Sequence, residues 1–173
     1  MRGRDVLLSF ETIVFTVVVP GTVTVFLPRY VLDLWGETLP TQWTSWQFAA
    51  LLPLSLGLVV YLRCLWEFAA RGRGIPAPID HPKQLVVTGL YQYVRNPMYV
   101  GVLLFLLGES VFFRSRGFLV YTLAWLGFVH LNVIVYEEPY LRHKFGGSYD
   151  RYTSSVRRWI PGKRYRGGIQ NAG

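Results

Sequence analysis

The sequence predicts an all-α fold: a polytopic helical membrane protein with about four transmembrane helices and a C-terminal interfacial amphipathic helix. Three observations predict it. Hydrophobic residues make up 51% of the 173 residues and charged residues only 16%, which is little charge for the surface of a soluble domain. The apolar residues gather in four long segments. The basic residues behind the net charge of +8 lie at the ends of these segments, where anionic lipid headgroups would meet them.

The four apolar segments have lengths typical of membrane-spanning helices. They run from about Val6 to Leu27, Trp46 to Ala70, Pro97 to Phe113 and Gly117 to Tyr136. A bilayer core takes roughly 20 helical residues, and only the third segment, which Glu109 interrupts, is marginal. The first segment follows two arginines as a signal peptide would. Its length, its Glu11 and the lack of a small-residue cleavage site nevertheless predict a retained span.

The distribution of Lys and Arg predicts the orientation of these spans. Basic residues crowd the N-terminus, the connection between the second and third segments, and the tail after the fourth. The positive-inside rule therefore places both termini and the middle connection in the cytoplasm, in agreement with an even number of spans. We expect three parts: a transmembrane hairpin over residues 1–70, a core with the functional site over 71–161, and a flexible basic tail over 162–173.

The start of the third segment is a candidate anion site. Asn96 and Pro97 suit the N-cap and the first position of a helix, so this helix is expected to begin there, at the cytoplasmic face. Its free N–H groups, together with the preceding Arg95, would attract a carboxylate or a phosphate. The alternative is that Arg95 anchors the chain to lipid phosphates.

Glu137 and Glu138, two carboxylates at the end of the fourth segment, indicate a cation nearby. Carboxylates at a helix C-terminus oppose the helix dipole at a cost of roughly 0.3–1 kcal/mol each, and poor solvation near a membrane raises this cost. Arg95 or a cationic ligand would offset it; the alternatives are a solvated helix end or a structural pair with nearby arginines. Pro139 is expected to end the helix and keep Glu138 extended. His130, seven residues before Glu137, is expected either to pack or to line the same cavity.

The segment Tyr140–Ile160 has apolar residues at helical spacing, with basic residues on the other side. Gly146 and Gly147 are expected to divide it into two pieces. We predict an interfacial amphipathic helix that caps the site, and a plain membrane anchor is the alternative. Cys64, inside the second apolar segment, is expected to be a packing residue.

Three stretches of the chain form an ordered motif set. They are His81–Tyr91, Arg95–Gly101 and a C-terminal group consisting of Glu137, Glu138, Leu141, Phe145, Gly146, Tyr149, Tyr152 and Trp159–Pro161. Together they resemble the isoprenylcysteine carboxyl methyltransferase family and the related phospholipid methyltransferases, over roughly residues 81–161. Two positions depart from the family pattern. Asn96 stands where His is usual and cannot titrate near neutral pH, and Leu90 stands where Pro is common.

The resemblance implies a membrane methyltransferase that uses S-adenosylmethionine and acts on a lipophilic acceptor, such as an isoprenylcysteine carboxylate or another lipid. It implies Arg95, Glu137 and Glu138 as catalytic residues. The cofactor pocket that it implies is formed by His81, Gln84, Leu85, Val86, Gly89, Leu90, Tyr91, Arg95, Pro97, Tyr99, Glu137 and Glu138. Arg95 would take the carboxylate of the cofactor, and Glu137 or Glu138 its ammonium group. The acceptor would enter from the bilayer. Neither a nucleic acid nor a metal is expected as a partner.

Two other functions stay open at this point. Membrane reductases of the sterol reductase type resemble the chain around Arg95–Gly101 and use NADPH. The carboxylates of Glu137 and Glu138 would repel the polyphosphate of that cofactor, which favours methyl transfer. A non-catalytic membrane protein of the same fold is the third possibility.

Overall fold

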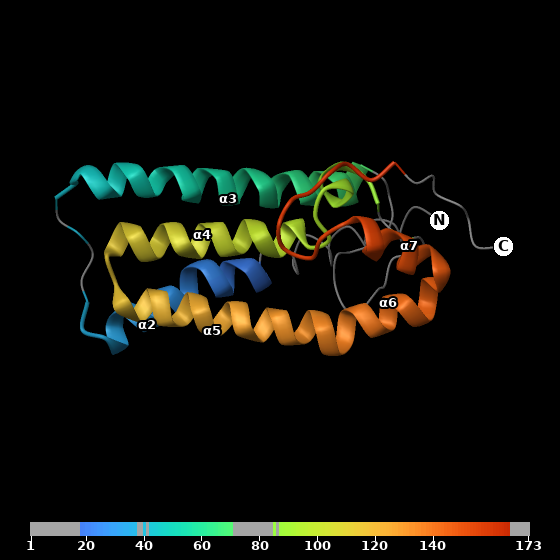
Figure 1. Cartoon of the computed structure of the whole chain (residues 1–173). Coiled ribbons are helices and arrows are strands. Elements are labelled where there is room, and N and C mark those ends of the chain that lie inside the picture. Colours follow the sequence, from blue (N-terminus) through green and yellow to red (C-terminus); the bar gives the residue numbers. More distant parts are fainter. Residues whose placement is uncertain (1–17, 38–39, 41, 71–84, 86, 167–173) are drawn as a thin grey trace, which may run out of the picture.

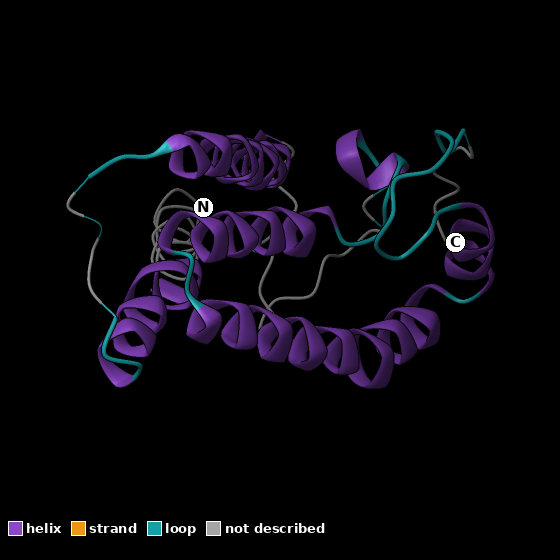
Figure 2. Ribbon diagram, turned by 60° about the vertical axis from the view of Figure 1, so that its left-hand side comes forward, coloured by secondary structure: helices purple, strands orange, loops and turns teal. Residues whose placement is uncertain are grey.

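The computed structural model describes residues 18–37, 40, 42–70, 85 and 87–166, and the regular structure of this part of the chain is helical (Figures 1 and 2). The predicted all-α class is confirmed. Most of the first predicted segment, which begins at Val6, lies outside the described residues. The described part of that segment is helical, and the helix runs on to Leu34, beyond the expected end at Leu27.

The helical elements match the predicted segments closely. In chain order they are η1 (Thr22–Phe26), α2 (Leu27–Leu34), α3 (Ser45–Ala70), η2 (Gly89–Gln92), α4 (Pro97–Phe113), α5 (Arg116–Asn132), η3 (Val133–Glu137), α6 (Glu138–Phe145) and α7 (Gly147–Ser155). Two stretches, Ser45–Glu67 and Arg116–Phe145, are long and apolar enough to cross a membrane, whereas α4 is apolar but shorter. The count of four spans stays a prediction.

Helices α3 and α4 lie side by side, and glycines allow their backbones to approach closely (Figure 1). A Cβ atom on Gly57 would lie 2.6 Å from the carbonyl oxygen of Gly101, and one on Gly108 would lie 2.6 Å from Cγ of Leu54. Small residues at such contacts are typical of membrane helices, where close packing has to supply the association energy that the hydrophobic effect supplies in water.

A tight turn joins α4 to α5. Arg114 adopts a left-handed conformation with φ 49°, and the Ser115 side chain caps α5 by accepting a hydrogen bond from the Phe118 amide at 2.9 Å. Behind the turn, the buried hydroxyls of Ser110 and Thr122 lie 3.1 Å apart and link the two helices. The turn therefore fixes α4 and α5 as antiparallel neighbours.

The helix that begins at Arg116 does not end at Pro139, and this expectation was wrong. It continues through the π-helical turn η3 into α6, and Glu138 is helical, with φ −65° and ψ −43°, rather than extended. A proline ring inside a helix crowds the carbonyl group four residues earlier and removes one hydrogen bond. A wider π-helical turn directly before the proline accommodates both effects. The same arrangement precedes Pro28, which follows η1.

Gly146 ends α6, as predicted, with φ 51° and ψ −132°, and α7 then turns back toward the start of α4 (Figure 1). The apolar face of α7 is buried within the protein. Tyr149 and Tyr152 form a core cluster with Val87 and Val156. This packing supports the capping role of the tail over that of a plain anchor.

Candidate functional site

The residues after α7 return to the segment that precedes α4, at the end of the bundle where α3 ends and α6 begins (Figure 1). Val94 forms an isolated parallel bridge with Arg157, and the Arg95 amide donates to the Arg157 carbonyl at 2.9 Å. Asn96 precedes the first residue of α4, but its side chain does not cap the helix. It donates instead to the Arg158 carbonyl at 3.2 Å. The Asn96 side chain therefore binds the tail, and it does not cap the first turn of α4 as expected.

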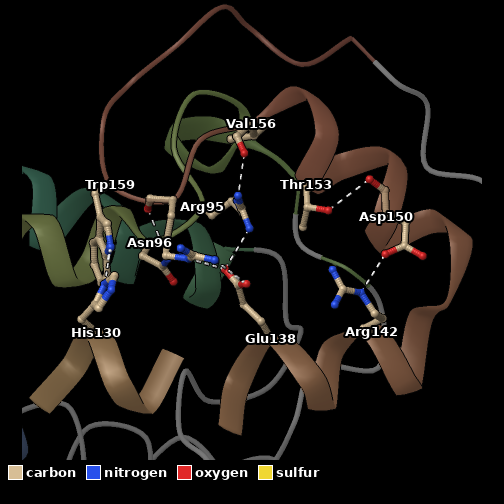
Figure 3. A network of polar contacts seen from close by, with 10 residues as sticks. Arg95, Asn96, His130, Glu138, Arg142, Asp150, Thr153, Val156 and Trp159 are labelled. Atoms are coloured by element: carbon tan, nitrogen blue, oxygen red, sulfur yellow. Dashed lines mark hydrogen bonds and ion pairs between the residues drawn. The ribbon is translucent and has the colours of Figure 1, made fainter. Parts of the chain in front are cut away.

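Glu138 lies between two guanidinium groups (Figure 3). Arg95 donates to Oε1 of Glu138 at 2.8 Å, and Arg158 donates to both carboxylate oxygens at 2.7 and 2.8 Å. Nε of Arg95 also donates to the Val156 carbonyl at 2.8 Å, which orients its guanidinium group. The hydrogen bond to Glu138 raises the pKa of Arg158 above its usual value. Two arginines and one carboxylate leave this cluster with a net positive charge.

Glu137 lies in a different environment, although it is adjacent in the chain. Its Oε1 accepts hydrogen bonds from the Tyr99 hydroxyl and, at 2.9 Å, from the Asn132 amide. Asn132 and Glu137 are five residues apart, and the π-helical turn between them brings such residues to one face of the helix. The ring of Trp125 packs edge-on against Tyr99, with centroids 6.3 Å apart. The partners of Glu137 in these contacts are neutral.

Tyr91 joins the turn before α4 to the rest of the site. Burial raises the pKa of its phenol well above the usual value, and four neighbouring groups act in the same direction: Cys64, Tyr152, Tyr99 and Glu137. These neighbours come from α3, α7, α4 and η3. The Tyr152 hydroxyl also donates to the Tyr91 carbonyl at 2.7 Å. Five elements of the chain therefore converge around one phenol.

The structure brings together most of the described residues that the sequence singled out. Arg95, Glu138, Glu137, Tyr99 and Tyr91 make the contacts given above, and Pro97 begins α4. Leu85 packs against the core cluster of α7, and Gly89 and Leu90 form the first half of η2. His81, Gln84 and Val86 lie outside the described residues.

His130 packs against Trp159 rather than against Glu137 or Glu138. Its Nδ1 accepts a hydrogen bond from Nε1 of Trp159 at 3.0 Å, and the two rings lie 5.9 Å apart (Figure 3). Cys64 is buried at 1% exposure, as expected for a packing residue.

Sequence reasoning missed three groups: Arg158, Asn132 and Glu67. Arg158 directly precedes the Trp159–Pro161 motif, so its position carried a usable signal. Asn132 carried none, because only the π-helical turn aligns it with Glu137. Glu67 of α3 has a carboxylate that is 6% exposed, and it belongs to a segment without a recognisable motif.

Comparison with known proteins agrees with the motif set. A family model described as phospholipid methyltransferase matches residues 46–148. The protein-S-isoprenylcysteine O-methyltransferase of Schizosaccharomyces pombe is 36% identical over 78 residues, which cover 44% of this chain and 33% of that protein. An uncharacterized protein of Haemophilus influenzae is 36% identical over 69 residues, which cover 36% of this chain and 100% of that protein.

The match to the first relative thus spans about a third of its length. No solved structure matches the chain. The family model covers more than half of the chain, from the second residue of α3 to the end of α6 and beyond, and includes both glutamates and the start of α4. The chain therefore belongs to the phospholipid methyltransferase family.

Proposed function

We propose that this chain is an integral membrane methyltransferase that transfers a methyl group from S-adenosylmethionine to a lipophilic acceptor. The observation that carries the proposal is the separation of charge around two adjacent carboxylates. Glu138 lies between Arg95 and Arg158, whereas Glu137 accepts hydrogen bonds from the neutral side chains of Tyr99 and Asn132. One environment suits an anion and the other a cation.

The arginine cluster is the proposed site for the carboxylate of the methyl donor. Arg95 and Arg158 together carry one positive charge more than Glu138 neutralises. Their side chains are 16% and 29% exposed, so a ligand at the surface of the cluster can reach them. Arginine binds carboxylates through charge-assisted hydrogen bonds, which are about twice as strong as neutral ones. In this arrangement Glu138 holds the two guanidinium groups in place.

Glu137 is the proposed site for a positive group of the methyl donor, which carries an ammonium on the same carbon as its carboxylate and a sulfonium farther along the chain. A carboxylate that is hydrogen-bonded to Tyr99 and near the Tyr91 phenol is a favourable environment for a cation. Because Glu138 is neutralised by arginines, Glu137 is the better candidate of the two for this role. The residues present therefore offer partners for the carboxylate and for a positive group of S-adenosylmethionine.

When bound, this donor supplies an electrophilic methyl carbon. Its bond from sulfur to the methyl carbon would break as the bond to a carboxylate oxygen, an amine nitrogen or a thiol sulfur forms, the donor would leave as a thioether, and an amine or thiol would release its proton to solvent. The residues of the chain have to hold donor and acceptor in line. Orientation of this kind supplies up to about 7–11 kcal/mol in ideal cases, so no catalytic triad is required.

The membrane arrangement is part of the proposal. We infer four spans. Two are the stretches that are long enough to cross a bilayer, and segments 6–27 and 97–113 are the other two. Both termini would then lie in the cytoplasm. Residues 71–161 would then form the methyltransferase core, residues 1–70 an N-terminal hairpin, and residues 162–173 a basic tail. In this core His81, Gln84, Leu85, Val86, Gly89 and Leu90 would complete the donor pocket, which the polar donor enters from the cytoplasm.

The acceptor is proposed to be lipophilic and to enter from the bilayer. The name of the Schizosaccharomyces pombe relative supports an isoprenylcysteine carboxylate, and the family model supports a phospholipid amine. A lipid extract incubated with the protein and S-adenosylmethionine that carries a labelled methyl group should yield a labelled lipid. Thin-layer separation of the products then identifies the acceptor class.

The central test is a binding titration of the purified protein in detergent. S-adenosylmethionine should bind saturably, and Glu137→Gln should weaken this binding more than tenfold, because it removes the carboxylate charge that faces a positive group of the donor. Asp150→Asn is the matched control, because Asp150 is an exposed carboxylate paired with Arg142 on the tail. Saturable binding of NADPH alone would replace the proposal with a reductase. Binding of neither ligand would favour a non-catalytic protein of the same fold.

A further inference from the structure

Glu67 is a buried carboxylate to which the proposed function gives no role. It lies near the end of α3, and its side chain is 6% exposed. Its partners are weak for a buried charged group. The Thr88 hydroxyl donates to Oε2 at 3.5 Å, and a guanidinium nitrogen of Arg63 lies 3.9 Å from Oε1, on a side chain that is 59% exposed. A contact of 3.9 Å to an exposed, flexible arginine contributes little to stability, so the salt bridge does not explain why Glu67 is buried.

The carboxylate of Glu67 lies directly against the backbone of Gly89. A Cβ atom on Gly89 would come within 1.8 Å of Oε1 and 2.1 Å of Oε2, so any larger residue would displace the Glu67 carboxylate. Gly89 also has φ +57°, a conformation that favours glycine. The positive φ favours glycine here, and the close approach shows that the Glu67 carboxylate of α3 lies against the turn.

Gly89 is the first residue of η2, the short turn that carries Tyr91. On one side, Glu67 and the Thr88 hydroxyl connect this turn to α3. On the other side, the Tyr152 hydroxyl of α7 donates to the Tyr91 carbonyl at 2.7 Å. The turn is therefore held between two helices, and the Tyr91 phenol is held near Glu137 and Tyr99.

We propose that Glu67 is a positioning residue that sets the conformation of the Thr88–Gln92 turn and, through it, the position of Tyr91 in the donor pocket. The effect on the turn is independent of which ligand binds. The effect on donor affinity rests on the proposed function. The proposal assigns a role in the site to the second apolar segment, which the family model covers but which lies outside the three motif stretches.

Two variants test the contact from both sides. Glu67→Gln keeps the shape of the side chain, but it replaces one carboxylate oxygen with an amide donor that would face the Thr88 hydroxyl or the Arg63 guanidinium. Thr88→Val removes the hydroxyl and keeps the branched shape. Two controls are matched to them: Thr88→Ser retains the hydroxyl, and Arg63→Gln removes the exposed partner of Glu67.

The first measurement is amide hydrogen exchange of the purified protein without ligand. The amides of Tyr91, Tyr93 and Val94 donate to carbonyls inside the turn and report its opening. We expect their exchange to accelerate about tenfold in Glu67→Gln and about threefold in Thr88→Val, with the amides of α4 and both controls unchanged. Unchanged exchange in both folded variants would overturn the proposal.

The second measurement is the affinity of each variant for S-adenosylmethionine. Both Glu67→Gln and Thr88→Val should weaken it, by about fivefold or more for Glu67→Gln, and the double variant should be no weaker than Glu67→Gln alone, because the two groups act through one contact. Faster exchange with unchanged affinity would make Glu67 a purely structural residue and overturn the proposal. If the wild-type protein does not bind S-adenosylmethionine at all, the proposed function fails, and the exchange rates alone decide whether Glu67 holds the turn.

Discussion

Arg158 donates hydrogen bonds to both carboxylate oxygens of Glu138, from Nε at 2.7 Å and from a terminal nitrogen at 2.8 Å. This two-point contact ties the segment after α7 to the first residue of α6, twenty positions earlier in the chain. Arg95 donates to the same carboxylate from the segment before α4. Three segments that are distant in sequence thus meet at the Glu138 side chain.

Replacement of Arg158 by lysine should destabilise the protein, because lysine carries a single ammonium group and cannot form the two parallel hydrogen bonds. The pair is partly exposed, so we expect a loss of about 1–2 kcal/mol in the free energy of unfolding. Thermal unfolding in detergent, followed by circular dichroism, measures this loss. Arg157→Lys is the control, because the Arg157 side chain is exposed. Equal unfolding temperatures for the two variants would show that the two-point contact has no stabilising effect.

The two adjacent glutamates should respond differently to the same substitution. Glu138→Gln leaves Arg95 and Arg158 without their counter-charge, so it should lower the free energy of unfolding by roughly 1–3 kcal/mol. Glu137→Gln should instead weaken S-adenosylmethionine binding more than tenfold, with a much smaller change in unfolding temperature. A titration and a melting curve on each variant separate the two effects. Unchanged affinity in both variants would contradict the assignment of a cation to this pair.

Tyr99→Phe should weaken S-adenosylmethionine binding by about two- to tenfold, because it removes a hydrogen bond that orients Glu137 and is worth roughly 0.5–1.5 kcal/mol. Combined with Glu137→Gln, it should cause little further loss. Tyr121→Phe is the matched control. The Tyr121 hydroxyl donates at 2.7 Å to the Val23 carbonyl, which lies in η1. Similar losses of affinity in both variants would argue against a specific role for Tyr99.

Gly57→Ala should destabilise the pairing of α3 and α4, since the added methyl group would lie 2.6 Å from the Gly101 carbonyl oxygen. Overpacking of this kind costs about 1–3 kcal/mol. Gly127→Ala in α5 is the comparison, because nothing lies within 4 Å of its added Cβ. There we expect a neutral or slightly stabilising effect of up to about 1 kcal/mol, from the better helix propensity of alanine. The unfolding temperatures of the two variants in detergent check this difference. An equal response would mean that the glycine contact does not control helix packing.

The sequence by itself determined the helical architecture and the family. The apolar segments predicted α3 and α4 to within a residue, because their lengths follow from the thickness of a bilayer core and from the start signal at Pro97. The end of α6 at Gly146 was also predictable from local sequence, because glycine readily adopts the positive φ found there. The ordered motifs pointed to methyltransferases, and the family model agrees.

Only the tertiary structure decided which side chains bind each of the two glutamates. The sequence left Glu137 and Glu138 equivalent, and it predicted a helix end at Pro139 where the helix continues. The π-helical turn before Pro139 aligns Asn132 with Glu137, while Glu138 receives Arg158 from the returning tail and Arg95 from the segment before α4. Glu67 likewise contacts Gly89 only because α3 packs beside the turn. A local pattern reports the backbone preferences of neighbouring residues, whereas the contacts of this site join residues as far as 62 positions apart and depend on how the helices pack.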